Sequence, residues 1–285
     1  MKNLRISEGL STAGELRAGS AARNGWGGRR VGAGRPPKSG RRNTAHVKRA
    51  PHRKEHPVHV VVRSEVRSLR SQFLFPTLRG VIGDTNRVLR GRFRICHFSV
   101  QGDHLHLLVE ADDGGWLRRG MHSLVARLAF RVNRLLMQSG RVIADRWYGR
   151  ALETARAVRR ALVYVLGNFR KHGQSTVLGG PCRESGSAPG AVSERNGFRN
   201  AVDVFSSAPY FSGYRELRGQ APVSVCASLI PAVISTRGPL PISDAQTLLL
   251  ATSWKRLGLL SVLEGPSTAS KASWARGAGP LRRAL

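Results

Sequence analysis

The sequence predicts an α+β protein built on a ferredoxin-like antiparallel sheet, with helices packed on one face of that sheet. Four short segments carry the β-branched or alternating apolar residues of strands, and longer segments between them carry apolar residues at helical spacing. Their order is strand, helix, strand, strand, helix, strand, followed by one more helix. The first six elements predict an antiparallel sheet with one face left open for a site.

The ordered part of the chain is expected to follow a basic arm. Residues 1–54 are rich in Gly, Arg, Ser and Lys and poor in large apolar side chains, a composition typical of disorder. Within this arm, Gly34, Arg35 and Pro36 are flanked by basic residues, a pattern similar to an AT-hook that lays an arginine in the DNA minor groove. The motif is short, and a solvated basic tail is the favoured interpretation.

The first half of the predicted domain contains a strand, a helix and a hairpin. The segment "HPVHVVVRS" at 56–64 is β-branched and predicts the first strand. Residues 73–89 are expected to be helical after Pro76. Strand-like runs at 92–101 and 104–111 are separated by Gly102 and Asp103, which predicts a tight hairpin.

The second half begins with a helix at 116–140, which has apolar residues at helical spacing and is expected to end at Gly140. Residues 141–152 predict a fourth strand, and 154–173 predict a helix from an N-cap at Thr154 to a stop at Gly173. We expect 55–173 to form one domain. Residues 174–285 start with a Gly/Ser/Pro-rich stretch and are expected to be a linker and an extension of unknown role, with a clear helical pattern only at 244–260.

The charge balance is the strongest compositional signal. The chain has 47 Lys and Arg against 17 Asp and Glu, a formal net charge of +30. Such a chain is expected to bind polyanions through phosphate contacts and counterion release. A basic protein without any chemistry is the alternative. No run approaches the roughly 18 apolar residues of a membrane span, and the arginines are not confined to one amphipathic helix, so we expect no membrane partner.

The cysteine pattern excludes a disulfide framework. Cys96, Cys182 and Cys226 are far apart, odd in number and form no CxxC pair. The first 25 residues lack the apolar core of a signal peptide. These observations predict a cytoplasmic protein.

Two histidines alternate with apolar residues in the predicted strand "HLHLLVEA". Successive strand side chains point to opposite faces, so His104 and His106 share a face and Leu105, Leu107 and Val109 share the other, buried one. A pair of imidazoles of this kind suits a metal site, but a polar sheet edge or chance produces the same pattern.

A tyrosine and an asparagine lie one turn apart on the last predicted helix of the domain. Tyr164 and Asn168 are four residues apart and share one side of the helix. Tyr164 lies at the margin of the apolar stripe, and the cations Arg160 and Lys171 fall on its side. On the helix pattern alone, Tyr164 is equally well explained as an ordinary residue at the edge of the core, with its ring buried and its hydroxyl in contact with solvent.

Together these features resemble the single-tyrosine transposases of the histidine-hydrophobic-histidine (HUH) class, particularly the REP-associated tyrosine transposases of bacteria. The resemblance covers most of 56–173 and rests on "HPVHVVVRS", "HFSVQGDHLHLLVE", "RVNRLLMQSGRVIADRWYGRAL" and "ALVYVLGNFRKH". It implies that His104 and His106 bind a metal and that Tyr164 is the nucleophile. Asn168 falls where several relatives carry a glutamine that completes the metal shell, and this difference puts the third ligand in doubt.

The resemblance also implies the reaction. A divalent metal, Mg²⁺ or Mn²⁺, would assist cleavage of single-stranded hairpin DNA, leaving a 5′-phosphotyrosine bond and a 3′-hydroxyl that can be rejoined. Imidazole nitrogens favour Mn²⁺ of the two. Relatives include monomers and homodimers, so the oligomeric state stays open.

Other functions and residues were weighed against this interpretation. One alternative is a decayed or domesticated relative that binds nucleic acid without catalysis. Another is a zinc hydrolase, although no third His, Asp or Glu lies at an obvious spacing. His59 either orients the site or is a half-exposed strand histidine, and the second interpretation is favoured. Three arginines of the 116–140 helix share a face that either follows a DNA backbone or is simply solvated: Arg127, Arg131 and Arg134.

Overall fold

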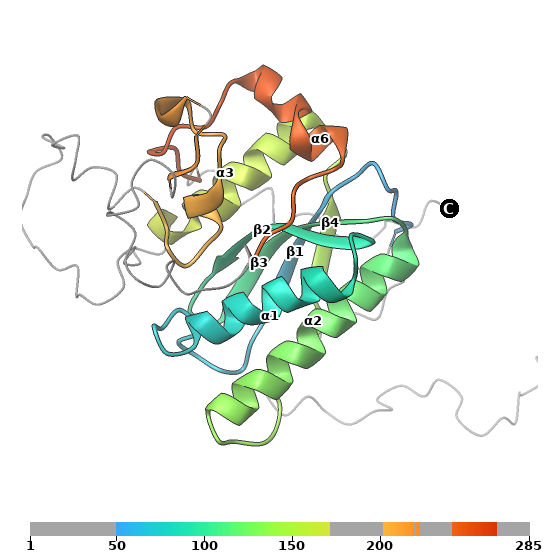
Figure 1. Cartoon of the computed structure of the whole chain (residues 1–285), viewed down its shortest axis with the longest axis vertical. Coiled ribbons are helices and arrows are strands. Elements are labelled where there is room, and N and C mark those ends of the chain that lie inside the picture. The colour runs from blue at the N-terminus through green and yellow to red at the C-terminus, as the bar shows by residue number, and fades with distance from the viewer. Residues whose placement is uncertain (1–49, 172–201, 219, 223–240, 267–285) are drawn as a thin grey trace, which may run out of the picture. The chain divides into compact units, whose positions relative to one another are not determined.

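The computed structural model describes residues 50–171, 202–218, 220–222 and 241–266 (Figure 1). Most of the predicted basic arm, including the AT-hook-like motif, lies outside these residues. The same holds for Gly173 and for most of the predicted linker. All the elements below belong to one compact unit of the chain.

The sheet has four antiparallel strands in the order β2-β3-β1-β4. These strands are β1 (Val58–Arg63), β2 (Phe93–Val100), β3 (His104–Ala111) and β4 (Tyr148–Ala151). With the helices between them, this is the ferredoxin-like arrangement, and the predicted fold class is confirmed. The β2–β3 hairpin turns through Gln101, Gly102 and Asp103, and the amide of Gln101 donates to the carbonyl of His104 at 2.8 Å.

Two helices cover one face of the sheet, as predicted. They are α1 (Phe75–Val88) and α2 (Gly114–Leu135), which lie below the sheet in Figure 1. The main core lies between them and the inward side chains of the strands. Pro76 is in the first turn of α1, and the Asp113 carboxylate caps α2 by accepting from the amide of Trp116 at 2.8 Å. At Gly120, α2 lies so close to β2 that an added Cβ would come within 2.2 Å of the Phe93 ring.

Two predicted boundaries were wrong. Helix α2 ends at Leu135, five residues before Gly140, because Met137 adopts a left-handed backbone with φ of 49°. The fourth strand is confined to Tyr148–Ala151, and upstream only an isolated bridge pairs Ser64 with Ile143.

The second face of the sheet carries α3 (Ala155–Lys171), which packs against β2 and β3. The predicted N-cap is confirmed: the Thr154 hydroxyl accepts from the amide of Ala157 at 3.1 Å. A second core forms here around α3, with Cys96 and Leu108 from the sheet and Trp254 from the C-terminal part of the chain. The orange and red segments in Figure 1 lie on this same side, so much of the face expected to be open is covered.

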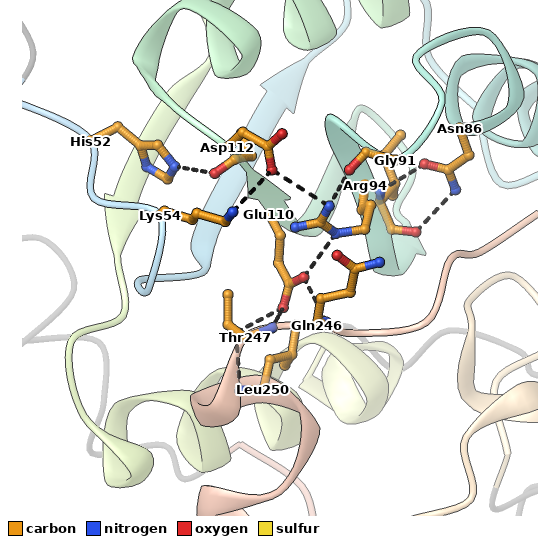
Figure 2. Close-up of polar contacts among 12 residues, drawn as sticks. His52, Lys54, Asn86, Gly91, Arg94, Glu110, Asp112, Gln246, Thr247 and Leu250 are labelled. Carbon is orange, nitrogen blue, oxygen red and sulfur yellow. Dashed lines mark hydrogen bonds and ion pairs between the residues drawn. The ribbon is translucent and has the colours of Figure 1, made fainter.

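A buried carboxylate joins the sheet to residues 241–250. Glu110 is fully buried and pairs with the Arg94 guanidinium at 3.1 Å. It also accepts from the amides of Gln246 and Thr247, at 2.9 and 3.0 Å, and from the Thr247 hydroxyl at 2.7 Å (Figure 2). Thr247 then caps the short α6 (Leu248–Ala251). The helix expected at 244–260 is therefore one α-helical turn, followed by the 3-10 helix η4 (Ser253–Leu257).

Residues 258–266 make polar contacts with side chains of α3. Arg159 makes a bidentate ion pair with Glu264 at 2.7 and 2.9 Å. Arg170 donates to the carbonyl of Val262 at 2.7 Å. The described parts of the C-terminal extension thus fold onto the helix that carries Tyr164. No helix in the described ranges is long and apolar enough to cross a membrane.

Candidate active site

Strand register brings three histidines to the α3 side of the sheet. In the β1–β3 ladder, His59 lies opposite Leu108, and His106 lies opposite Val61. His106 and His59 are therefore diagonal neighbours on one face. The prediction that His104 and His106 face away from Leu105 and its apolar partners is confirmed, since those leucines belong to the core on the other face.

A chain of close polar contacts links these histidines. Nδ1 of His104 lies 2.6 Å from the Asp103 carboxylate, and its Nε2 lies 3.1 Å from Nε2 of His106. Nδ1 of His106 lies 3.2 Å from Nε2 of His59. The order along this chain is Asp103, His104, His106, His59.

The end contacts constrain the tautomers in the middle. Asp103 accepts from Nδ1–H of His104, which leaves a lone pair on Nε2 of a neutral His104 ring. If Nδ1–H of His106 donates to His59, His106 also presents a lone pair on Nε2. In that tautomer two lone pairs face each other, and a bound cation would satisfy both. A carboxylate behind one histidine ligand is a common way to fix its orientation on a metal.

The two Nε2 atoms lie 3.1 Å apart, close enough for both to be ligands of one metal ion. Within the described ranges, no three His, Cys, Asp or Glu side chains are placed to hold a metal, so further ligands from these residues would be amide or water oxygen.

Tyr164 packs directly on the histidines. Its ring meets the His106 ring edge-on, with centroids 5.1 Å apart, and the His59 ring with centroids 5.8 Å apart. Lys171 places its ammonium 5.0 Å from the centre of the tyrosine ring. The ring is partly buried, and burial raises the pKa of its hydroxyl above the ordinary value. The phenol therefore depends on nearby positive charge to ionise.

Asn168 is a buried amide without a partner among the described residues. The side chain is fully buried, yet neither Oδ1 nor Nδ2 makes a hydrogen bond there. It lies one turn after Tyr164, on the same side of α3. An unsatisfied buried amide is costly to a fold, so this position suits a group that binds something.

Solved structures similar to this chain include two transposases. One is a REP-associated tyrosine transposase bound to a REP hairpin, with 19% identity over 46% of this chain and 75% of that chain and a TM-score of 0.38. The other is a candidate transposase from Deinococcus radiodurans R1, with 11% identity over 47% of this chain and 98% of that chain and a TM-score of 0.31. No protein-family model and no curated protein matches the chain.

The predicted DNA-binding cations fall into two groups. Arg160 and Lys171 lie on α3, the helix of Tyr164. The other three lie on α2, which packs on the opposite face of the sheet, and the structure does not bring them to the histidines: Arg127, Arg131 and Arg134. Arg131 is also engaged in an ion pair with Asp84.

Two residues of this site were not predicted. His59 was expected to be half-exposed but is buried, because the α3 side of the sheet is covered. Burial, with the Arg150 guanidinium opposite, lowers the pKa of His59 to about 4, so its ring is neutral at pH 7. Asp103 was predicted only as a residue of the hairpin turn. Its position directly before His104 is the sequence signal that could have identified it as the hydrogen-bond partner of that histidine.

Proposed function

We propose that this chain is a metal-dependent tyrosine transposase of the HUH class, which cleaves and rejoins single-stranded DNA. The observation that carries this proposal is the contact of the Tyr164 ring with His106, whose Nε2 lies 3.1 Å from that of His104. A nucleophile beside a pair of potential metal ligands is the arrangement that phosphoryl transfer to a side chain needs.

The reaction follows from the chemistry of these groups. The Tyr164 oxygen bonds to phosphorus and gives up its proton, while the bond from phosphorus to the 3′ oxygen breaks and that oxygen takes up a proton. The products are a 5′-phosphotyrosine and a strand ending in a 3′-hydroxyl. Attack by a 3′-hydroxyl on the phosphotyrosine reverses these steps and joins strands.

The chain's own residues have distinct roles in this scheme. His104, His106 and Asn168 would hold Mg²⁺ or Mn²⁺, which when bound would polarise the scissile phosphate and offset charge in the transition state. Asp103 and His59 keep the two ligand rings in place. Lys171 lies near enough to the tyrosine ring to favour its phenolate.

Single-stranded hairpin DNA is the proposed substrate. The net charge of +30 supports a polyanionic partner.

The test is incubation with labelled single-stranded hairpin DNA and Mn²⁺, followed by denaturing electrophoresis. We expect a denaturation-resistant complex whose nucleotide maps to Tyr164 by mass spectrometry. Tyr164→Phe should fold and bind DNA without forming it, whereas the control Tyr210→Phe should form it normally. An adduct on another tyrosine, or one retained by Tyr164→Phe, contradicts the assignment.

A second candidate function is nucleic-acid binding without catalysis. The net charge of +30 supports it, since binding to phosphates through charge needs no nucleophile. DNA binding by the wild type with no adduct on any hairpin would support this candidate.

A further inference from the structure

Helix α3 leaves part of its face of the sheet accessible. It packs against β2 and β3, on one side of the sheet order. The other side is formed by β1 and the edge strand β4. Tyr164 touches His59 of β1 and His106 of β3, so it lies where the covered and accessible parts meet.

Three exposed side chains lie on the accessible part, which we call the β1–β4 patch: Arg63, Tyr148 and Arg150. Register places them on the same face as the histidines. Arg63 lies directly opposite His104, Arg150 opposite His59, and Tyr148 opposite Val61.

Strand pairing places both arginines next to the site. Arg150 of β4 pairs with His59, which contacts His106. Arg63 of β1 pairs with His104. A phosphate near the histidines is therefore within reach of positive charge from two strands.

The patch combines the two features that bind single strands. Its arginines supply charge for phosphates, and Tyr148, half of whose surface is exposed, supplies an aromatic face for a base. Arg150 lies opposite His59, and Arg63 is four residues further along β1. The two arginines are therefore separated by about 13 Å along the strand direction. The arginines of α2 lie on the other face and cannot share this path.

We propose that the β1–β4 patch binds the single-stranded DNA next to the scissile phosphate, with a base stacked on Tyr148 and phosphates held by Arg63 and Arg150. The proposal rests on the proposed function for its substrate class, but it concerns binding and not cleavage.

The test measures binding alone. All proteins carry Tyr164→Phe and are kept in EDTA, so neither an adduct nor a metal contributes. The probe is a fluorescein-labelled 15-nucleotide oligothymidylate, titrated by fluorescence anisotropy at several salt concentrations. Thermal melting by circular dichroism verifies that each variant is folded.

We expect Tyr148→Ala to weaken binding about 5- to 100-fold, the range for one lost stacking contact, and Tyr148→Phe to restore it. Arg63→Gln and Arg150→Gln should each reduce the slope of log K against log salt by about 0.7. Arg118→Gln, an exposed arginine of α2 with the same change of charge, should leave the slope as it is.

Four results overturn the proposal. The first three are unchanged affinity in the patch variants, equal loss in Arg118→Gln, and loss confined to variants of Arg127 and Arg134. The fourth is failure of the oligonucleotide to bind the Tyr164→Phe parent. If the patch variants behave as expected but the wild type never forms an adduct, the patch stands and the proposed reaction fails.

Discussion

Nε2 of His59 lies 3.2 Å from Nδ1 of His106, and the two rings stack with centroids 5.3 Å apart. We therefore expect His59 to be a positioning residue that fixes the ring of His106. His59→Ala should lower Mn²⁺ affinity about 10- to 100-fold, the usual effect of losing the partner of a metal ligand. Isothermal titration of the DNA-free protein with Mn²⁺ measures it.

The matched control for His59 is His97, which lies on the same face of the sheet but contacts Ser207 and Phe211. His97→Ala should cost stability and leave Mn²⁺ affinity intact. Equal Mn²⁺ affinities in the two variants would mean that His59 serves only packing.

We expect the Asn168 side chain to serve the reaction and to destabilise the metal-free fold. Because its buried amide has no partner among the described residues, Asn168→Leu should leave the melting temperature of the metal-free protein unchanged or raise it. The same variant should slow adduct formation about 10- to 100-fold in Mn²⁺.

Asn86 provides the comparison for Asn168. Its amide group is fully used, accepting from the amide of Ile95 at 2.7 Å and donating to the carbonyls of Ile95 and Pro241. Asn86→Leu should therefore lower the melting temperature. A clear loss of stability in metal-free Asn168→Leu would show that Asn168 is a structural residue.

The ion pair of Glu110 with Arg94 is expected to be needed for docking of residues 241–250. Glu110→Ala leaves the buried Arg94 guanidinium with only the longer ion pair to Asp112, at 3.9 Å, and should lower the free energy of unfolding by about 3–5 kcal/mol. The double variant Arg94→Met, Glu110→Leu should lose less, because no unpaired charge remains. Urea denaturation gives both values, and a double variant less stable than the single one would refute this account.

Stability should depend on pH through His97. Burial lowers its pKa from 6.5 to about 4. Between these values the unfolded chain binds a proton that the folded chain does not, so the free energy of unfolding falls as the pH drops. The contribution of His97 should be about 2–3 kcal/mol between pH 7 and pH 4.5.

His97→Gln isolates this contribution, because the acidic groups and His59 titrate in both proteins. Urea denaturation at the two pH values should show a smaller acid-induced loss of stability in the variant than in the wild type. An equal loss in both would exclude His97 as the source.

The sequence by itself determined those features that depend on neighbouring residues. Strand alternation placed His104 and His106 on one face and Leu105 on the other, and helical periodicity placed Tyr164 above Asn168. The order of the elements was enough for the fold class. These patterns are local because side-chain direction follows from the rotation between consecutive residues.

Only the tertiary structure decided what lies beside these side chains. The β1–β3 register brings His59 to His106, 47 residues away in sequence, and Glu110 reaches Thr247 across 137 residues. Residues 202–217 and 241–266 cover the sheet face that the order of strands alone leaves open. Register and long-range docking depend on the total packing and hydrogen-bond energy of distant segments, which no local period encodes.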